Sequence, residues 1–170
     1  MRRFVNPGNT AFEVAVNSQI YVDKTGLLAY TNSVINTKQA LICSSRPRRF
    51  GKSITADMLC AYYSRGCDSD SIFASYEIAK SDYYKKHLNQ YDVIYLDIQW
   101  CMMDAGSAEQ TVSYLNYHVI EELKEIYPQI LPDGIRTAYG AMSCINAQTG
   151  VKFIVIIDEW DVLIRDEAAN

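Results

Sequence analysis

The sequence predicts an α/β protein in which a parallel sheet is flanked by helices. Three apolar runs with strand character, residues 39–44, 92–99 and 151–159, alternate with segments of helical spacing. This alternation favours a parallel sheet, because a parallel connection needs a long crossover that is usually a helix. The third run is rich in β-branched residues up to its acidic end, which indicates a strand buried on both faces.

Helical patterns occupy most of the chain around these strands. They cover residues 25–35, 52–64, 72–91, 107–127 and 133–146. Asp23 or Thr25 can cap the first of these helices, and Pro128 stops the fourth. A short strand or an extended segment is expected around residues 19–22, before the first helix.

The loop between the first strand and the next helix carries a phosphate-binding pattern. It ends in Gly51, Lys52 and Ser53 and leads directly into the helix. A helix N-terminus offers free N–H groups and a partial positive charge to a phosphate. Lys52 then reaches the outer phosphates, and the Ser53 hydroxyl can ligate Mg²⁺. The sequence therefore predicts a P-loop NTPase-like sheet, although Arg46 stands where the general pattern has its first glycine.

Two adjacent carboxylates, Asp158 and Glu159, end the third strand. At this edge of a parallel sheet an Asp can hold the Mg²⁺ of a bound nucleotide, and the next Glu can orient or deprotonate water. A single acid here would often be a simple cap, but two acids downstream of a Gly-Lys-Ser loop favour a nucleotide site. Asp97 ends the second strand, either as a cap or as part of the Mg²⁺ shell.

Three segments resemble the signatures of the predicted AAA-like ATPase family. They are Tyr21-Val22-Asp23-Lys24-Thr25, Arg46-Pro47-Arg48-Arg49-Phe50-Gly51-Lys52-Ser53 and Asp158-Glu159-Trp160-Asp161. The loop of this family typically reads R-P-R-R-F-G-K-S, so Arg46 fits the family pattern. The resemblance spans about residues 21–161 and implies ATP binding and hydrolysis. It implies that the whole loop is the nucleotide site, known as Walker A. It also implies that Ser53 and Asp158 are the Mg²⁺ ligands, with Asp158 in the Walker B motif, and that Glu159 is the catalytic residue.

The same resemblance bears on the domain. Such ATPases insert a further strand with a polar sensor residue, then a helical lid and often an arginine from a neighbouring molecule, and a nuclease-like domain often follows. We therefore expect one incomplete P-loop ATPase domain, with residues 1–36 as a lead-in and helix and residues 37–170 as the nucleotide-binding core. The chain alone is expected to bind ATP weakly, to turn it over poorly and to self-associate. The segment around Lys24 and Thr25 either lies near the nucleotide or is an ordinary capped helix.

Composition sets the remaining limits. The chain has 170 residues, of which 49% are hydrophobic and 21% charged, as in ordinary globular proteins. A net charge of −4 does not indicate nucleic acid as a partner. The five cysteines include no C-x-x-C pair, and with two histidines the chain lacks zinc-ligand spacing. No apolar run has the length of a membrane span and no signal peptide is present, so we expect a cytoplasmic protein.

Three functions remain compatible with these motifs. The first is Mg²⁺-dependent ATP hydrolysis coupled to a conformational change. The second is a nucleotide-binding switch or assembly module with little turnover. The third is a small-molecule phosphotransferase, against which the acidic pair weighs weakly.

Overall fold

The computed structural model describes residues 2–45 and 50–169, which divide into two compact units. We call Met1–Pro7 with Tyr91–Asn170 the strand unit and Gly8–Gln90 the helical unit. The predicted phosphate loop belongs to the helical unit, and the predicted acidic strand end belongs to the strand unit. The expected single domain, with a boundary near residue 36, stays a prediction.

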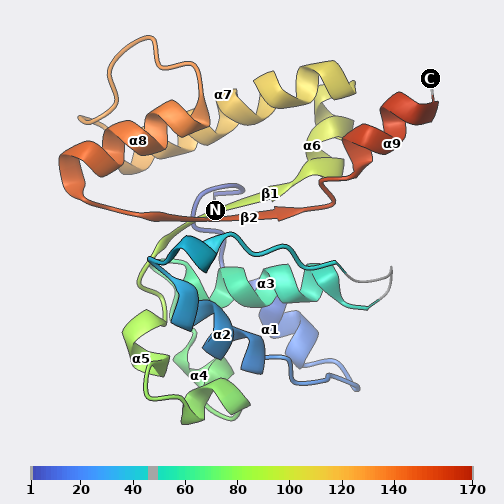
Figure 1. Ribbon diagram of the computed structural model, residues 1–170, viewed down its shortest axis with the longest axis vertical. Coiled ribbons are helices and arrows are strands. Elements are labelled where there is room, and N and C mark those ends of the chain that lie inside the picture. Colours follow the sequence, from blue (N-terminus) through green and yellow to red (C-terminus); the bar gives the residue numbers. More distant parts are fainter. Residues whose placement is uncertain (1, 46–49, 170) are drawn as a thin grey trace. The chain divides into compact units, whose positions relative to one another are not determined.

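The strand unit is built on two parallel strands, β1 (Asp92–Asp97) and β2 (Phe153–Asp158) (Figure 1). Their register places Asp97 opposite Asp158 at the C-terminal edge. On the other side of β1, Val5 forms an antiparallel bridge with Ile94. The predicted strands at residues 92–99 and 151–159 are thus confirmed as a parallel pair, and the protein is a mixed α/β structure.

Helices α6 (Ile98–Ala105), α7 (Ala108–Ile126), α8 (Ala138–Thr149) and α9 (Val162–Ala169) complete the strand unit. Figure 1 shows α7 and α8 side by side along the sheet. The core between these helices and the sheet contains Ile94, Leu123 and Ile145, which are almost fully buried. Ser107 and Thr137 cap α7 and α8 by accepting backbone N–H groups, as expected for such hydroxyls. The predicted helices at residues 107–127 and 133–146 are confirmed, the second beginning five residues later; α9 was not predicted.

The helical unit contains α1 (Thr10–Val16), α2 (Gly26–Val34), η1 (Lys38–Ala40), α3 (Lys52–Tyr63), α4 (Asp70–Phe73), η2 (Glu77–Lys80) and α5 (Tyr84–His87). Its core is aromatic: Phe12 stacks on Phe73 with ring centroids 5.1 Å apart. The hydroxyl of Tyr62 accepts from Asn32, and the hydroxyl of Tyr63 donates to Asn32 at 2.8 Å. These bonds tie α2 to α3 and leave both buried hydroxyls satisfied, as buried polar groups require.

The predicted first strand, residues 39–44, is wrong. Part of this run forms η1, and the chain from Leu41 to the last described residue before the gap has no regular structure. The Leu41 side chain is 95% exposed. The described residues of the helical unit contain no strand that could pair with this run, and an unpaired strand would leave its N–H and C=O groups without partners.

Two further predictions are corrected. Residues 19–22, expected to form a short strand or an extended segment, form no strand in the described structure. The helix expected at residues 72–91 is broken into α4, η2 and α5. The segment contains two serines, one aspartate and one asparagine, whose side chains can bond to local backbone groups in ways that compete with a helix.

Candidate functional site

The described part of the predicted loop forms the N-terminus of α3. Gly51 is the residue before the helix and has φ +74°, a left-handed conformation that glycine adopts readily. Lys52 and Ser53 are the first two helical residues; Ser53 is exposed and Lys52 half-buried. No described side chain caps this helix. Its first N–H groups are therefore available to an anion, as the phosphate interpretation requires.

The other predicted loop residues are Arg46, Pro47, Arg48, Arg49 and Phe50. Residues 46–49 lie outside the described residues, so their predicted contacts with nucleotide stay predictions. Phe50 is described and half-exposed, at 57%. Its carbonyl oxygen accepts a hydrogen bond from Lys24 Nζ at 2.6 Å. Lys24 thus contacts the loop from a segment 26 positions earlier, which spacing alone could not reveal.

The predicted acidic pair lies at the end of β2. Asp158 is buried, with 7% of its surface exposed. Its Oδ1 accepts the N–H of Glu159, whereas its Oδ2 is buried and has no hydrogen-bond partner within residues 2–45 and 50–169. A buried carboxylate oxygen without a partner is costly, and a bound cation or a proton donor would relieve that cost. The Asp158 carboxylate is therefore chemically suited to serve as a ligand of a divalent cation.

Glu159 begins the turn between β2 and α9. Its φ is +51°, which is uncommon for a residue with a side chain and is found often at functional sites. Its carboxylate lies 3.2 Å from the guanidinium of Arg165 on α9, and Arg165 also pairs with Asp161. Sequence reasoning missed Arg165, because α9 itself was not predicted.

Asp97 caps α6 by accepting the N–H of Trp100 at 3.0 Å. A capping role was one of the two alternatives predicted for this residue, the other being a place in the Mg²⁺ shell. Paired residues of a parallel ladder point to the same face, so Asp97 and Asp158 share one face of the sheet. Burial raises the pKa of Asp97, and the charges of Asp158 and Glu159 raise it further, against the lowering effect of the Trp100 N–H. In the described part of the chain, no three His, Cys, Asp or Glu side chains converge in a metal-binding arrangement. A Mg²⁺ site here would thus rely on one or two carboxylates with phosphates and water, which is common for this ion.

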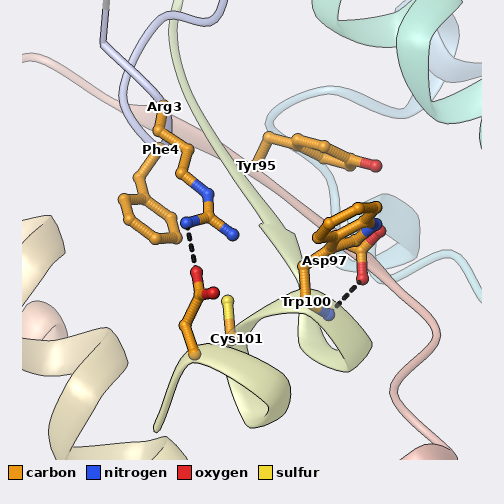
Figure 2. Close-up of a pocket in the computed structure, with 7 residues that line it drawn as sticks. Arg3, Phe4, Tyr95, Asp97, Trp100 and Cys101 are labelled. Carbon is orange, nitrogen blue, oxygen red and sulfur yellow. Dashed lines mark hydrogen bonds and ion pairs between the residues drawn. The ribbon is translucent and has the colours of Figure 1, made fainter.

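A small pocket beside the end of β1 was also not predicted (Figure 2). Figure 2 shows Tyr95 and Asp97 from β1, Trp100 and Cys101 from α6, and Arg3 with Phe4 from the N-terminal segment. Arg3 is ion-paired with Asp104. Its cation is therefore already neutralised by a carboxylate, which makes this hollow a poor anion site.

A comparison with known protein families matches residues 8–170 to a family described as predicted AAA-ATPase. The chain belongs to this family. The resemblance seen in the three sequence segments is thereby confirmed. Comparisons with curated proteins and with solved structures found no match.

In this predicted AAA-ATPase, the sequence motifs fall into two groups. In the helical unit, Lys24 bonds to the Phe50 carbonyl and lies close to Gly51, and Lys52 and Ser53 follow as the first residues of α3. Asp158 and Glu159 meet further polar groups at the sheet edge of the strand unit. No helix within the described residues is long and apolar enough to cross a membrane.

Proposed function

We propose that this predicted AAA-ATPase binds ATP with Mg²⁺ and hydrolyses it, and that hydrolysis drives a conformational change. The observation that carries the proposal is the N-terminus of α3, which no described side chain caps, which follows a left-handed Gly51 and which begins with Lys52 and Ser53. Membership of a predicted AAA-ATPase family supports the same nucleotide.

Each residue has a distinct task in the proposed reaction. The N–H groups at the start of α3 bind phosphate oxygens, and Lys52 adds a charge-assisted contact to the outer phosphates. Ser53 and Asp158 would hold Mg²⁺, which supplies charge neutralisation at the phosphates. The buried and unpartnered Oδ2 of Asp158 supports this assignment. Glu159 would orient or deprotonate the attacking water.

Three variants test these tasks separately. Lys52→Ala should abolish binding of a labelled ATP analogue, measured by fluorescence anisotropy, while circular dichroism shows an intact fold. Asp158→Asn should weaken binding only when Mg²⁺ is present. Glu159→Gln should keep ATP bound and slow phosphate release by about 10²-fold, a typical general-base contribution. Unchanged affinity in Lys52→Ala would overturn the nucleotide site.

One observation favours a second candidate, a nucleotide-binding switch with little turnover. The Glu159 carboxylate is ion-paired with Arg165 through Oε2, which engages one of the two oxygens that could orient water. Single-turnover measurements separate the two candidates: phosphate release supports the ATPase, and stable bound ATP supports the switch. Adding candidate acceptor molecules in the same assay would reveal phosphotransferase activity.

A further inference from the structure

The segment Asp23, Lys24 and Thr25 is fixed to the rest of the helical unit by both of its outer residues. Asp23 Oδ1 accepts the N–H of Thr25 at 2.8 Å, and Asp23 Oδ2 accepts the N–H of Glu77 at 3.0 Å. The Thr25 hydroxyl accepts the N–H of Ile78 at 3.2 Å, and the Thr25 side chain is fully buried. These bonds attach the segment to η2, so the backbone from which Lys24 extends is held in place.

Lys24 uses this fixed base to reach the loop before α3. Its ammonium group donates to the Phe50 carbonyl oxygen at 2.6 Å. It also lies so close to Gly51 that a Cβ at that position would be 2.9 Å from Nζ, nearer than real Cβ contacts come. The left-handed φ of Gly51 favours glycine at this position, whereas the flexible end of Lys24 could shift away from a Cβ at little cost.

This contact has a consequence for the next amide. A trans peptide is planar, so the Phe50 carbonyl and the Gly51 N–H point in opposite directions. When Lys24 holds the carbonyl on its own side, the Gly51 N–H is turned away from Lys24. A charge-assisted hydrogen bond of this kind is stronger than a neutral one, so it can hold the peptide in one orientation.

We propose that Lys24 is a positioning residue of the phosphate site. Its ammonium group fixes the peptide between Phe50 and Gly51, so that the Gly51 N–H faces the phosphate that Lys52 and Ser53 reach. This inference rests on the proposed function, because it assigns a task within the same site. It also explains why an aspartate and a buried threonine flank this lysine: they set its position.

The test compares three variants of the full chain. Lys24→Met removes the donor and its charge but keeps an unbranched side chain one atom shorter, and Lys24→Arg keeps a cationic donor. Lys38→Met is the matched control, because Lys38 is an exposed lysine of η1 in the same unit. We expect Lys24→Met to weaken binding of a labelled, non-hydrolysable ATP analogue about tenfold, which corresponds to about 1.4 kcal/mol. Lys24→Arg should recover most of the affinity, and Lys38→Met should match the wild type.

Two further measurements separate positioning from simple destabilisation. Because the Gly51 N–H contacts substrate and transition state alike, Lys24→Met should raise the KM for ATP and leave kcat within about twofold. The urea midpoint of Lys24→Met should stay near that of Lys38→Met. If Lys24→Met does not fold, Lys24→Gln takes its place in every comparison.

Lys52→Ala, measured in parallel, distinguishes the two ways of failing. If Lys52→Ala loses binding while Lys24→Met binds as tightly as Lys38→Met, the positioning role is overturned and the nucleotide site stands. If Lys52→Ala binds normally, the proposed function itself fails. If Lys24→Arg binds as weakly as Lys24→Met, a cationic donor at this position is not sufficient and the inference is also overturned.

Discussion

Glu122 on α7 holds the N-terminal segment of the strand unit through three backbone groups. Its carboxylate accepts the N–H of Arg3 at 2.8 Å, of Phe4 at 2.9 Å and of Val5 at 2.7 Å. Phe4 and Val5 are buried core residues, and Val5 forms the bridge to β1. Glu122 therefore fixes the segment that covers one edge of the sheet whose C-terminal end carries the acidic residues.

The effect of removing this carboxylate can be worked out from these contacts. Hydrogen bonds to charged groups contribute about 1.5–3 kcal/mol each. Counting the two part-buried bonds, to Phe4 and Val5, at the lower end gives a loss of about 3 kcal/mol for Glu122→Ala. Since domains unfold at a cost of about 5–15 kcal/mol, this is a large fraction of the stability. Both of these bonds go to Oε2, so the carbonyl oxygen of Glu122→Gln can keep both as neutral bonds of about half the strength, and this variant should lose about half as much.

Urea unfolding followed by tryptophan fluorescence measures this loss directly. Both tryptophans, Trp100 and Trp160, belong to the strand unit, so the signal reports on the unit in question. Glu121→Ala is the matched control, because within the described residues the Glu121 side chain forms an exposed ion pair with Lys124 on the same helix, worth about 0.3–0.5 kcal/mol. A free energy of unfolding for Glu122→Ala equal to that of Glu121→Ala would refute the reasoning.

Two more predictions concern Asp97 in the strand unit and the cysteines of both units. Asp97→Asn should stabilise the protein at neutral pH, since asparagine caps a helix as well as aspartate does and carries no charge. Because folding raises the pKa of Asp97, the fold is more stable with this carboxyl group protonated than with it ionised. The contribution of the Asp97 side chain to stability is therefore full below the ordinary pKa of 3.8 and is lost as the pH rises through the folded-state pKa. The advantage of Asn in urea midpoint should therefore vanish below pH 3.8, and a pH-independent difference would contradict this. Among the cysteines, exposed Cys43 should react rapidly with a thiol reagent, whereas Cys60 and Cys101 should react only on unfolding; burial raises the pKa of both, that of Cys101 to about 11. Rapid labelling of Cys60 or Cys101 in the native protein, located by mass spectrometry, would contradict the burial of these two thiols.

Local patterns in the sequence were sufficient for several elements. Both strands of the observed sheet, the start of α3 at Lys52 and the long helix α7 were predicted, because each depends on periodicity and capping signals within a short window. The loop and acidic motifs led to the family for the same reason, since each is contiguous in the chain. The assignment of individual residues to nucleotide and metal stays a prediction.

Only the tertiary structure decided which distant groups meet. Glu122 accepts from residues 117 to 119 positions away, and Lys24 reaches Phe50 from 26 positions away, so no local pattern indicates either contact. The apolar run at residues 39–44 shows the converse. Its composition is that of a strand, but a strand exists only where a neighbour pairs its backbone groups, and none of the described residues does so. Strand or helix propensity is a property of a segment alone. The pairing of a strand, the burial of a side chain and the orientation of an ammonium group depend on which other parts of the folded chain lie next to them.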